Sequence, residues 1–497
     1  MDICNIGGIT DILRIFESVQ WSAKGGCGDM ESDDIATEGD GNGLKKTMGP
    51  AFLFTMAVAT IIGPWLVMTN WWLSLTGPSI FLSFVIVGLM CIPIGLVYGE
   101  LTAMLPQVGG SFYFIKKAFG NEASFWVSWS LILSYTAVLS FQLLAFTNIV
   151  QYLWLPGLSV EGVMLISAIL AVLCFFINSR QLSISALTQL IMTVVLAVIG
   201  IGYVLLFFVS PQYNTANLSP FFSTGLSGFV TATALMVTMF FGFEVIPQFA
   251  EESKYPVKKH WRLITVALIF SVGFYGLICI GEAGMGPLDT LVNTPMLGAE
   301  LALHAYGPWL QYTIAIGNIA ALVGCLIGFW LAGSRLMLSM GREGILPKSF
   351  TKLNKNHVPS TTNFVILLIV LMFILLSGTS WISSLFSLMA LGVGVAYTSV
   401  SISYFQYRKK FSELERPWKL PGGKFTAGLA VLDGALITFF TIEYFTVDVW
   451  TLCAIYFAIG VVIRVLLHHY KPFNQSHEIK TPSVLNPMEI VKKDEPQ

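Results

Sequence analysis

Glu244 is the residue with the clearest chemical potential, because it is an acid inside a long apolar run. Residues 239–247 read MFFGFEVIP, so Gly242 and Pro247 flank Glu244 within six positions. An ionisable side chain at the centre of a bilayer costs at least about 2.5–3.5 kcal/mol, so its presence there indicates function. We expect Glu244 to take up and release a proton, or to contact a bound amine. The structural alternative is a permanently protonated acid that caps the nearby backbone.

A second apolar run contains the pair Gly63-Pro64. Proline cannot donate to the helix ladder, and the groups it frees at membrane depth must bond to protein, water or a ligand. Tolerated kinks are the alternative for either run alone, since Gly and Pro are common in membrane helices. The expected binding residues at the two interruptions are Ile62, Gly63, Pro64, Trp65, Leu66, Phe241, Gly242, Phe243 and Glu244.

Other polar residues within apolar runs are candidates for lining a pocket: Tyr135, Asn318, Ser384 and Ser387. Each can instead bond to its own helix or to a neighbouring one. Glu100 and Arg335 lie at the ends of two apolar runs, where charged groups reach lipid headgroups or pair with each other. For these two residues we expect a structural or gating role rather than substrate contact.

Known catalytic motifs are absent from the chain. None of the six histidines lies in the middle of an apolar run, and there is neither an HExxH metal motif nor a Gly-Lys-Ser/Thr phosphate loop. We therefore predict no metal site, no cofactor and no ATPase activity, and an enzymatic function is disfavoured.

The composition sets the class of protein. Of 497 residues, 11% are charged and 55% are hydrophobic, and the mean hydropathy is +0.74. Soluble domains are about 25% charged. The net charge of -1 gives no basic face for a nucleic acid, and the seven cysteines are too sparse for a disulfide scaffold. The composition indicates an all-α polytopic membrane protein.

Apolar runs of about 20 residues mark membrane-spanning helices. Twelve such runs are predicted, at residues 49–72, 79–104, 123–154, 161–178, 184–209, 225–250, 261–282, 309–337, 361–377, 382–405, 426–446 and 449–468. With the N-terminus in the cytoplasm, all 27 Lys and Arg residues fall in cytoplasmic tails and loops. This distribution supports twelve spans with both termini inside. It also predicts a disordered acidic tail over residues 1–47, a transmembrane domain over 48–470 and a cytoplasmic tail over 471–497.

The two interrupted runs are the first and the sixth. The sixth span comes five spans after the first. Because five is an odd number, a second set of five begins from the opposite side of the membrane. Interrupted helices at matching positions of two inverted halves indicate the substrate site of a transporter. Such a site offers amide donors to an anion and carbonyl acceptors to a cation, which suits an amino acid.

Four motifs carry a resemblance to the amino acid–polyamine–organocation (APC) transporter superfamily. They are YGELTAMLPQVGGSFYFIKKAFG at residues 98–120, FEVIPQFAEE at 243–252, SRLMLSMGREGILP at 334–347 and RPWKLPGG at 416–423. The resemblance implies a LeuT-like fold of two inverted five-helix repeats plus two peripheral helices, with discontinuous helices 1 and 6. It also implies alternating access around a midplane site. One departure is that Gly63-Pro64-Trp65 replaces the Gly-Ser-Gly-like break of the family, which affects the expected substrate more than the fold.

The resemblance also bears on coupling. Relatives with a sodium site place hydroxyls on the eighth span, and some proton-coupled relatives place a Lys on the fifth. Neither device is present in this chain, because residues 322–328 of the eighth span contain no Ser or Thr and the fifth span contains no Lys. We therefore predict an amino acid permease of the plasma or inner membrane that works by proton symport or exchange. The alternatives are a polyamine or small-amine transporter of the same fold and a ligand sensor that does not transport. The lipid bilayer and a small-molecule substrate are the expected partners, and the oligomeric state stays open.

Overall fold

The computed structural model describes residues 46, 48–180, 182–356, 358–378, 381–443 and 445–470. The two predicted tails, residues 1–47 and 471–497, lie outside the described residues except for position 46. Two compact units make up the chain, Met1–Cys453 and Ala454–Gln497, and the described part of the second is the C-terminal end of one helix.

All the regular elements of the described chain are helical. The main helices are α2 (Pro50–Ile61), α3 (Trp65–Thr76), α4 (Ile80–Met104), α5 (Gly110–Phe119), α6 (Asn121–Trp154), α7 (Val160–Asn178), α8 (Leu182–Val209), α9 (Gly225–Met236), α10 (Val245–Gln248), α11 (His260–Ala283), α12 (Leu288–Val292), α13 (Leu297–Tyr306), α14 (Pro308–Arg342), α15 (Ser360–Leu376), α16 (Trp381–Lys410), α17 (Lys424–Glu443) and α18 (Val447–Tyr470).

Each of the twelve predicted apolar runs coincides with a helix or with a pair of helices interrupted by a break. Among the described residues, ten helical segments are long and apolar enough to cross a membrane. The apolar helices Pro50–Ile61 and Ser360–Leu376 are shorter than a full span. The prediction of a multi-pass helical protein is therefore confirmed.

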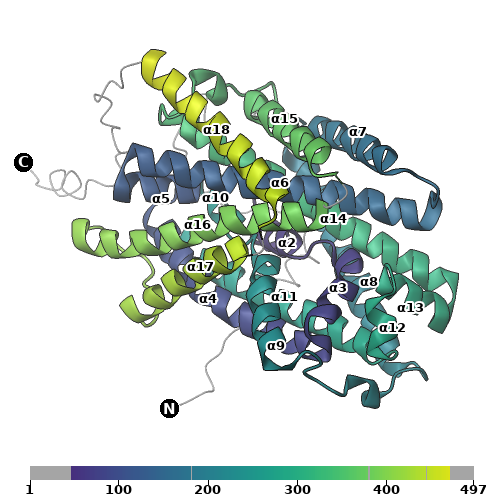
Figure 1. The fold of residues 1–497 in the computed structure, drawn as a ribbon. Coiled ribbons are helices and arrows are strands. Elements are labelled where there is room, and N and C mark those ends of the chain that lie inside the picture. Colours follow the sequence, from purple (N-terminus) through teal and green to yellow (C-terminus); the bar gives the residue numbers. More distant parts are fainter. Residues whose placement is uncertain are drawn as a thin grey trace, which may run out of the picture. The chain divides into compact units, whose positions relative to one another are not determined.

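Packing separates central helices from peripheral ones. In their most apolar stretches, α6 is 94% buried and α14 is 83% buried, whereas α7 is only 17% buried. Leu165, Ile169 and Leu173 of α7 recur every four residues and are all at least half exposed. Residues at that spacing share one helix face, so α7 presents an apolar stripe to lipid. Figure 1 shows α6, α14 and α16 running in the same general direction, with α2 between α11 and α14.

Small residues allow the central helices to approach closely. A Cβ added to Gly392 of α16 would meet the carbonyl oxygen of Ser130 on α6 at 2.2 Å, so only glycine fits there. The hydroxyl of Ser134 on α6 donates to the carbonyl of Met389 on α16. Small side chains and interhelical hydrogen bonds are the usual means of helix association in a bilayer.

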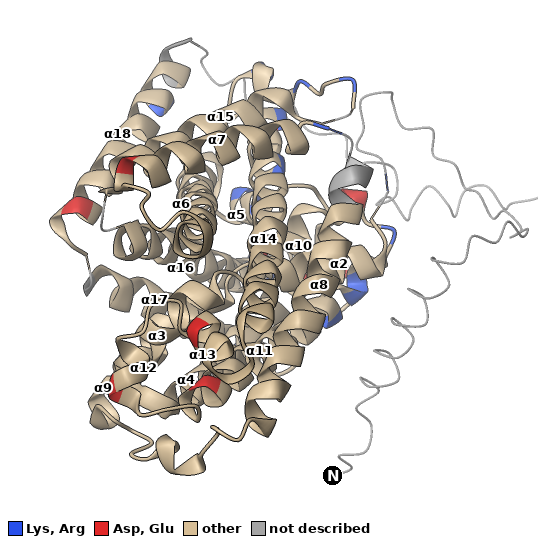
Figure 2. Ribbon diagram, turned by 90° about the vertical axis from the view of Figure 1, so that its right-hand side faces the viewer, with Lys and Arg blue, Asp and Glu red and all other residues tan. Residues whose placement is uncertain are grey.

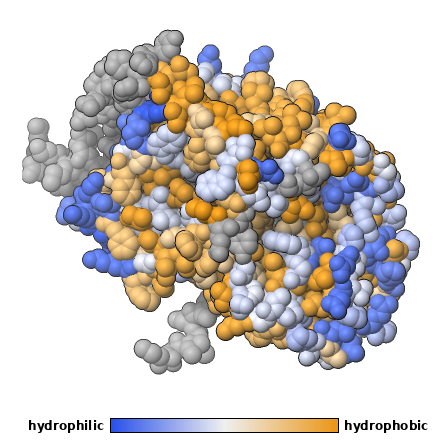
Figure 3. All heavy atoms as spheres, in the orientation of Figure 1, coloured by the Kyte–Doolittle hydropathy of each residue, from blue (hydrophilic) through white to orange (hydrophobic). Residues whose placement is uncertain are grey.

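Charged residues divide the first unit into two sides. Figure 2 shows Lys and Arg gathered near α5, α10 and the end of α14, and only acids near α9, α12 and α13. We call these the basic side and the acidic side. On the face drawn in Figure 3, hydrophobic residues form a broad band and hydrophilic residues gather at its left and right edges. This layering fits a protein that spans a bilayer.

Candidate functional site

The first helix break lies between α2 and α3. Ile62 is extended, Gly63-Pro64 is not helical, and α3 restarts at Trp65. The hydroxyl of Tyr275 on α11 accepts a hydrogen bond from the Gly63 N–H at 3.0 Å and donates to the Ile61 carbonyl at 2.8 Å. The Asn318 amide on α14 donates to the Gly63 carbonyl at 3.1 Å. In this conformation the protein itself therefore satisfies three of the backbone groups at the break, the Gly63 N–H and the carbonyls of Ile61 and Gly63.

The second break lies between α9 and α10. A short 3-10 turn ends at Phe240, and residues 241–244 are unwound before α10 begins at Val245. Gly242 has φ +124°, a conformation that disfavours residues with a side chain. Both predicted interruptions are thus confirmed as backbone breaks.

The two breaks interlock. The hydroxyl of Thr60, at the end of α2, donates to the Gly242 carbonyl at 3.0 Å. A Cβ at Gly242 would lie 2.8 Å from both the carbonyl carbon and the carbonyl oxygen of Thr60. The missing side chain at Gly242 therefore lets the two unwound segments touch.

Glu244 is fully buried beside the second break. Its Oε2 accepts hydrogen bonds from the Gly242 N–H at 2.7 Å and from the Tyr397 hydroxyl on α16 at 2.6 Å. Its Oε1 has no hydrogen-bond partner among the described residues. Buried nearby, the Tyr135 hydroxyl interacts with both Glu244 and Gln248, although neither contact has the geometry of a well-formed hydrogen bond. This loosely bonded polar cluster can accommodate a proton or a water molecule.

A small cavity lies between the two breaks, and we call it the break cavity. Its volume is about 20 Å³, which is room for about one water molecule. It is lined mainly by apolar side chains together with backbone of the first break: Thr60, Ile61, Gly63, Pro64, Val138, Phe141, Gln142, Thr238, Met239, Phe241, Phe386 and Met389. An amino acid enters this space only if the surrounding helices move apart.

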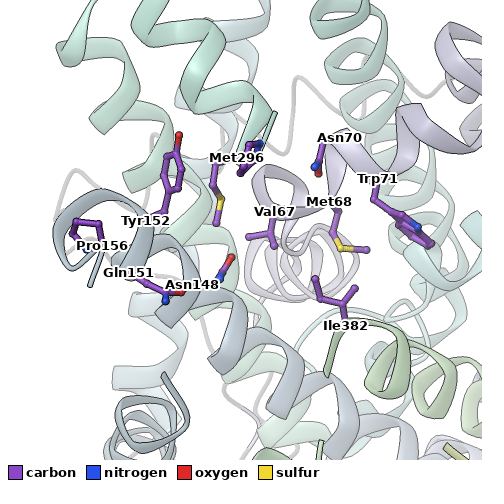
Figure 4. Close-up of a pocket in the computed structure, with 11 residues that line it drawn as sticks. Val67, Met68, Asn70, Trp71, Asn148, Gln151, Tyr152, Pro156, Met296 and Ile382 are labelled. Carbon is purple, nitrogen blue, oxygen red and sulfur yellow. Dashed lines mark hydrogen bonds between the residues drawn. The ribbon is translucent and has the colours of Figure 1, made fainter. Parts of the chain in front are cut away.

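A larger cavity of about 480 Å³ opens toward the acidic side, and we call it the outer cavity. Figure 4 shows side chains around it from α3, α6 and the start of α16, together with Met296 before α13. Trp71 lines the outer cavity and Phe386 lines the break cavity. Their rings meet edge to face at 5.5 Å, so this aromatic pair stands between the two cavities.

The basic side is closed by ion pairs. Arg335 on α14 makes two hydrogen bonds to Glu252, 2.9 Å to Oε1 and 3.2 Å to Oε2, and both side chains are buried. Nearby, Arg342 pairs with Glu251 at 3.1 Å, and Lys116 pairs with Glu343. These contacts join the end of α14 to the segment after α10 and to α5. Access to the break cavity from the basic side is therefore sealed in this conformation.

Glu100 and Arg335 do not pair with each other, because Arg335 directs its Nε and one Nη to the two carboxylate oxygens of Glu252. Glu100 instead accepts from Arg408 at 2.8 Å and from the Leu420 N–H at 2.6 Å. It therefore fastens α4 to the end of α16 and to the loop before α17.

The structure brings some of the predicted binding residues together and leaves others apart. Gly63, Pro64 and Phe241 line the break cavity. Asn318 bonds to the first break, and Glu244 bonds to the second but is not part of the cavity wall. The remaining candidates do not line this cavity, and all of them are buried: Ile62, Trp65, Leu66, Tyr135, Gly242, Phe243, Ser384 and Ser387.

Trp65 points away from the break cavity. Its ring stacks on Tyr203 of α8, with centroids 5.1 Å apart. The aromatic pair between the two cavities is instead Trp71–Phe386. Gln142, Tyr275 and Tyr397 also lie at the breaks and were not predicted from the sequence. Gln142 carries a usable signal, because it is an amide in the middle of an apolar run. The two tyrosines cannot be told apart from other aromatic residues without the fold.

Cys325 of α14 lies where the first break meets α6. Its thiol is 3.7 Å from the Thr60 carbonyl oxygen, and it accepts from the Gln142 amide at 3.1 Å. A thiol is a weak ligand for a hard cation, which prefers oxygen donors. At this position α14 therefore presents a thiol rather than a hydroxyl to the first break.

Comparisons with known proteins agree with this geometry. The family model described as amino acid permease matches residues 51–464. The branched-chain amino acid permease BcaP of Bacillus subtilis is 26% identical over 419 residues, covering 80% of this chain and 89% of the relative. The methylthioribose transporter of the same organism is 23% identical, covering 87% and 96%. Its aspartate-proton symporter is 25% identical, covering 80% of each chain.

Proposed function

Because the chain belongs to the amino acid permease family of the APC superfamily, we propose that it carries amino acids with apolar side chains across the cell membrane. It is a multi-pass membrane transporter rather than an enzyme. Relatives act on branched-chain amino acids and on aspartate, so family membership alone leaves the substrate open. The wall of the break cavity favours the apolar class.

The observation that carries this proposal is the break cavity itself. Unwound backbone at the first break lies on one side of it, suited to the ammonium and carboxylate groups of an amino acid. Val138, Phe141, Met239 and Met389 supply an apolar wall for the side chain. Asp, Glu, Lys and Arg are absent from the described residues that line it. A charged substrate side chain therefore has no counter-ion there.

We propose twelve spans, made of two inverted five-helix repeats followed by the peripheral helices α17 and α18. The basic side faces the cytoplasm, because cytoplasmic loops carry the excess of Lys and Arg. Both termini then lie inside, flanking a transporter domain over residues 48–470. With the basic side sealed by Arg335 and Glu252, the outer cavity is the entry path for substrate.

The proposed transport cycle opens two contacts in turn, the Trp71–Phe386 pair and the Arg335–Glu252 pair. Substrate enters the outer cavity and passes the Trp71–Phe386 pair when its rings separate. The half-helices α3 and α9 then close over it, and release to the inside requires the Arg335–Glu252 pair to move apart. The role proposed for Glu244 is to bind a proton beside the second break, where the Tyr135 hydroxyl lies within its reach. This cycle is alternating access with proton symport or, without net proton movement, exchange.

Two alternatives use the same fold. A polyamine requires carboxylates in the cavity wall, and Glu244 is directed to Gly242 and Tyr397 instead. A sensor without transport activity draws its support from the acidic tail, which lies outside the described residues. Both are therefore less well supported than transport of apolar amino acids.

The test is uptake by purified protein in proteoliposomes. Labelled leucine, lysine, aspartate and putrescine are compared under an inward proton gradient, under a sodium gradient and with cold substrate preloaded. We expect accumulation of leucine driven by the proton gradient. Leucine counterflow that does not respond to any gradient identifies an exchanger. Uptake of putrescine alone identifies an amine transporter, and binding without uptake identifies a sensor.

A further inference from the structure

A second buried acid lies outside the break cavity. Glu282 is the penultimate residue of α11 and is fully buried. It is enclosed by Thr69 of α3, Tyr203 of α8 and Gly298 of α13. Neither the break cavity nor the outer cavity includes it. The transport cycle described above does not use it, and an acid buried in a membrane protein without a role is unexpected.

The bonding of Glu282 is incomplete. Its Oε1 accepts from the Tyr203 hydroxyl at 3.2 Å. Its Oε2 makes no well-formed hydrogen bond in the part of the chain that the structure describes, although the Thr69 hydroxyl lies close enough to interact with the carboxyl group. The titratable groups that face it are Tyr203 and Cys279, and no described Lys or Arg pairs with it. An ionised carboxylate in this place would be buried without a counter-ion, so the neutral acid is the form that fits.

Side-chain contacts link Glu282 to the first break. Tyr203, which donates to Glu282, stacks on Trp65, the first residue of α3. On the other side, a Cβ at Gly298 would lie 2.6 Å from Oε1 of Glu282, so the start of α13 rests directly on the carboxyl group. A change at Glu282 therefore acts on both α3 and α13.

Both of these helices also form the wall of the outer cavity. Val67 and Met68 of α3 line it immediately before Thr69, and Met296 lines it two residues before Gly298. Met296 has φ 49°, a left-handed conformation that is uncommon for a residue with a side chain. Strained backbone of this kind is found at segments that change conformation. A short displacement of the start of α13 would therefore let water from the outer cavity reach Glu282.

We propose that Glu282 is a second proton-binding site, which couples protonation from the outer solution to closure of α3 and α13 over the outer cavity. The direction of the effect rests on the proposed function, in which the acidic side faces outward. When Glu282 is ionised, it requires water, and the wall formed by α3 and α13 stays apart. When it binds a proton from the outer cavity, the neutral carboxyl group fits the dry packing seen here, with Oε2 beside Thr69. Low external pH thus favours the closed outer wall.

The test uses E282Q, which copies the neutral acid in shape, and E300Q as a matched control. Glu300 is also an acid at α13, but it is partly exposed and bonds to Tyr152. Each protein is placed in lipid nanodiscs. Infrared difference spectra between low and high pH report carboxylic acid protonation, and hydrogen exchange of residues 288–306, corrected for intrinsic rates, reports opening of α12 and α13. Neither readout requires transport.

We expect E282Q to lose one pH-dependent carboxylic acid band and to keep α13 protected at every pH, while wild-type protein and E300Q lose protection as the pH rises. E282D keeps a titrating band, which covers the case in which E282Q does not fold. A wild-type band pattern in E282Q, or pH-dependent protection unchanged from wild type, would overturn the proposal. If no substrate of the panel is transported while the band and the protection behave as expected, the transport proposal fails and the proton site stands.

Discussion

Replacing Gly242 with alanine tests whether the interlock of the two breaks is required for transport. The substitution forces a side chain onto φ +124° and places its Cβ 2.8 Å from backbone atoms of Thr60, which cannot rotate away. A strained backbone of this kind costs about 1–3 kcal/mol. Loss of the Thr60 hydrogen bond to the Gly242 carbonyl adds about 0.5–1.5 kcal/mol.

Together these costs amount to about 1.5–4.5 kcal/mol against the interlocked conformation. Since about 1.4 kcal/mol is a factor of ten, its population falls by roughly 10- to 1,600-fold. We expect leucine uptake by G242A in proteoliposomes to fall by a similar factor. Thermal unfolding followed by intrinsic fluorescence checks that the protein is still folded.

Two further alanine variants separate the effect of backbone strain from the effect of the clash with Thr60. Gly225 also has a positive φ, +73°, but nothing lies within 4 Å of an added Cβ, so G225A carries backbone strain without the clash. Gly428 has open space around it and its φ lies outside the left-handed region, so G428A is expected to behave as wild type. Uptake by G242A at the wild-type rate, or an equal loss in G225A, would refute the argument that contact between the breaks is what matters.

Three further substitutions address single contacts. Y275F removes the hydroxyl that accepts from the Gly63 N–H, which costs about 1–3 kcal/mol. We therefore expect weaker leucine binding, measured by equilibrium dialysis, and an unchanged affinity would contradict this role. E252Q leaves Arg335 buried without its carboxylate partner, which costs about 3–5 kcal/mol. We therefore expect a lower unfolding temperature. An unfolding temperature equal to that of the wild type would mean that the ion pair contributes little to stability. E244Q cannot release a proton, so leucine accumulation should no longer respond to a proton gradient, and a preserved pH dependence of uptake would exclude the proton role.

Much of the fold is readable from the sequence because membrane helices are specified locally. A run of about 20 apolar residues is sufficient to mark a span, since the backbone in lipid must bond to itself. The breaks at Gly63-Pro64 and Gly242 were predictable for a related reason. Proline removes a donor wherever it stands, and the glycine at the second break has a φ that other residues avoid.

The site depends on contacts that no local rule predicts. Gln142, Tyr275 and Tyr397 come from α6, α11 and α16, and each reaches the breaks across a long stretch of sequence. Many aromatic residues in this chain have the same local surroundings, so only the packing of the helices distinguishes the ones that bond to a break. For the same reason Trp65, adjacent to the first break in sequence, faces Tyr203 rather than the cavity.

Charged residues show most clearly what the sequence predicts and what only the tertiary structure decides. Counting Lys and Arg along the sequence predicts which loops share a side, because each span reverses the direction of the chain. The partner of a given charge is a different matter. Arg335 pairs with Glu252 and Glu100 with Arg408, although Glu100 and Arg335 were equally plausible partners by sequence. Sequence therefore located the apolar helices along the chain, whereas tertiary structure decided which side chains meet, because a hydrogen bond or ion pair forms only between atoms that packing brings within about 3–4 Å.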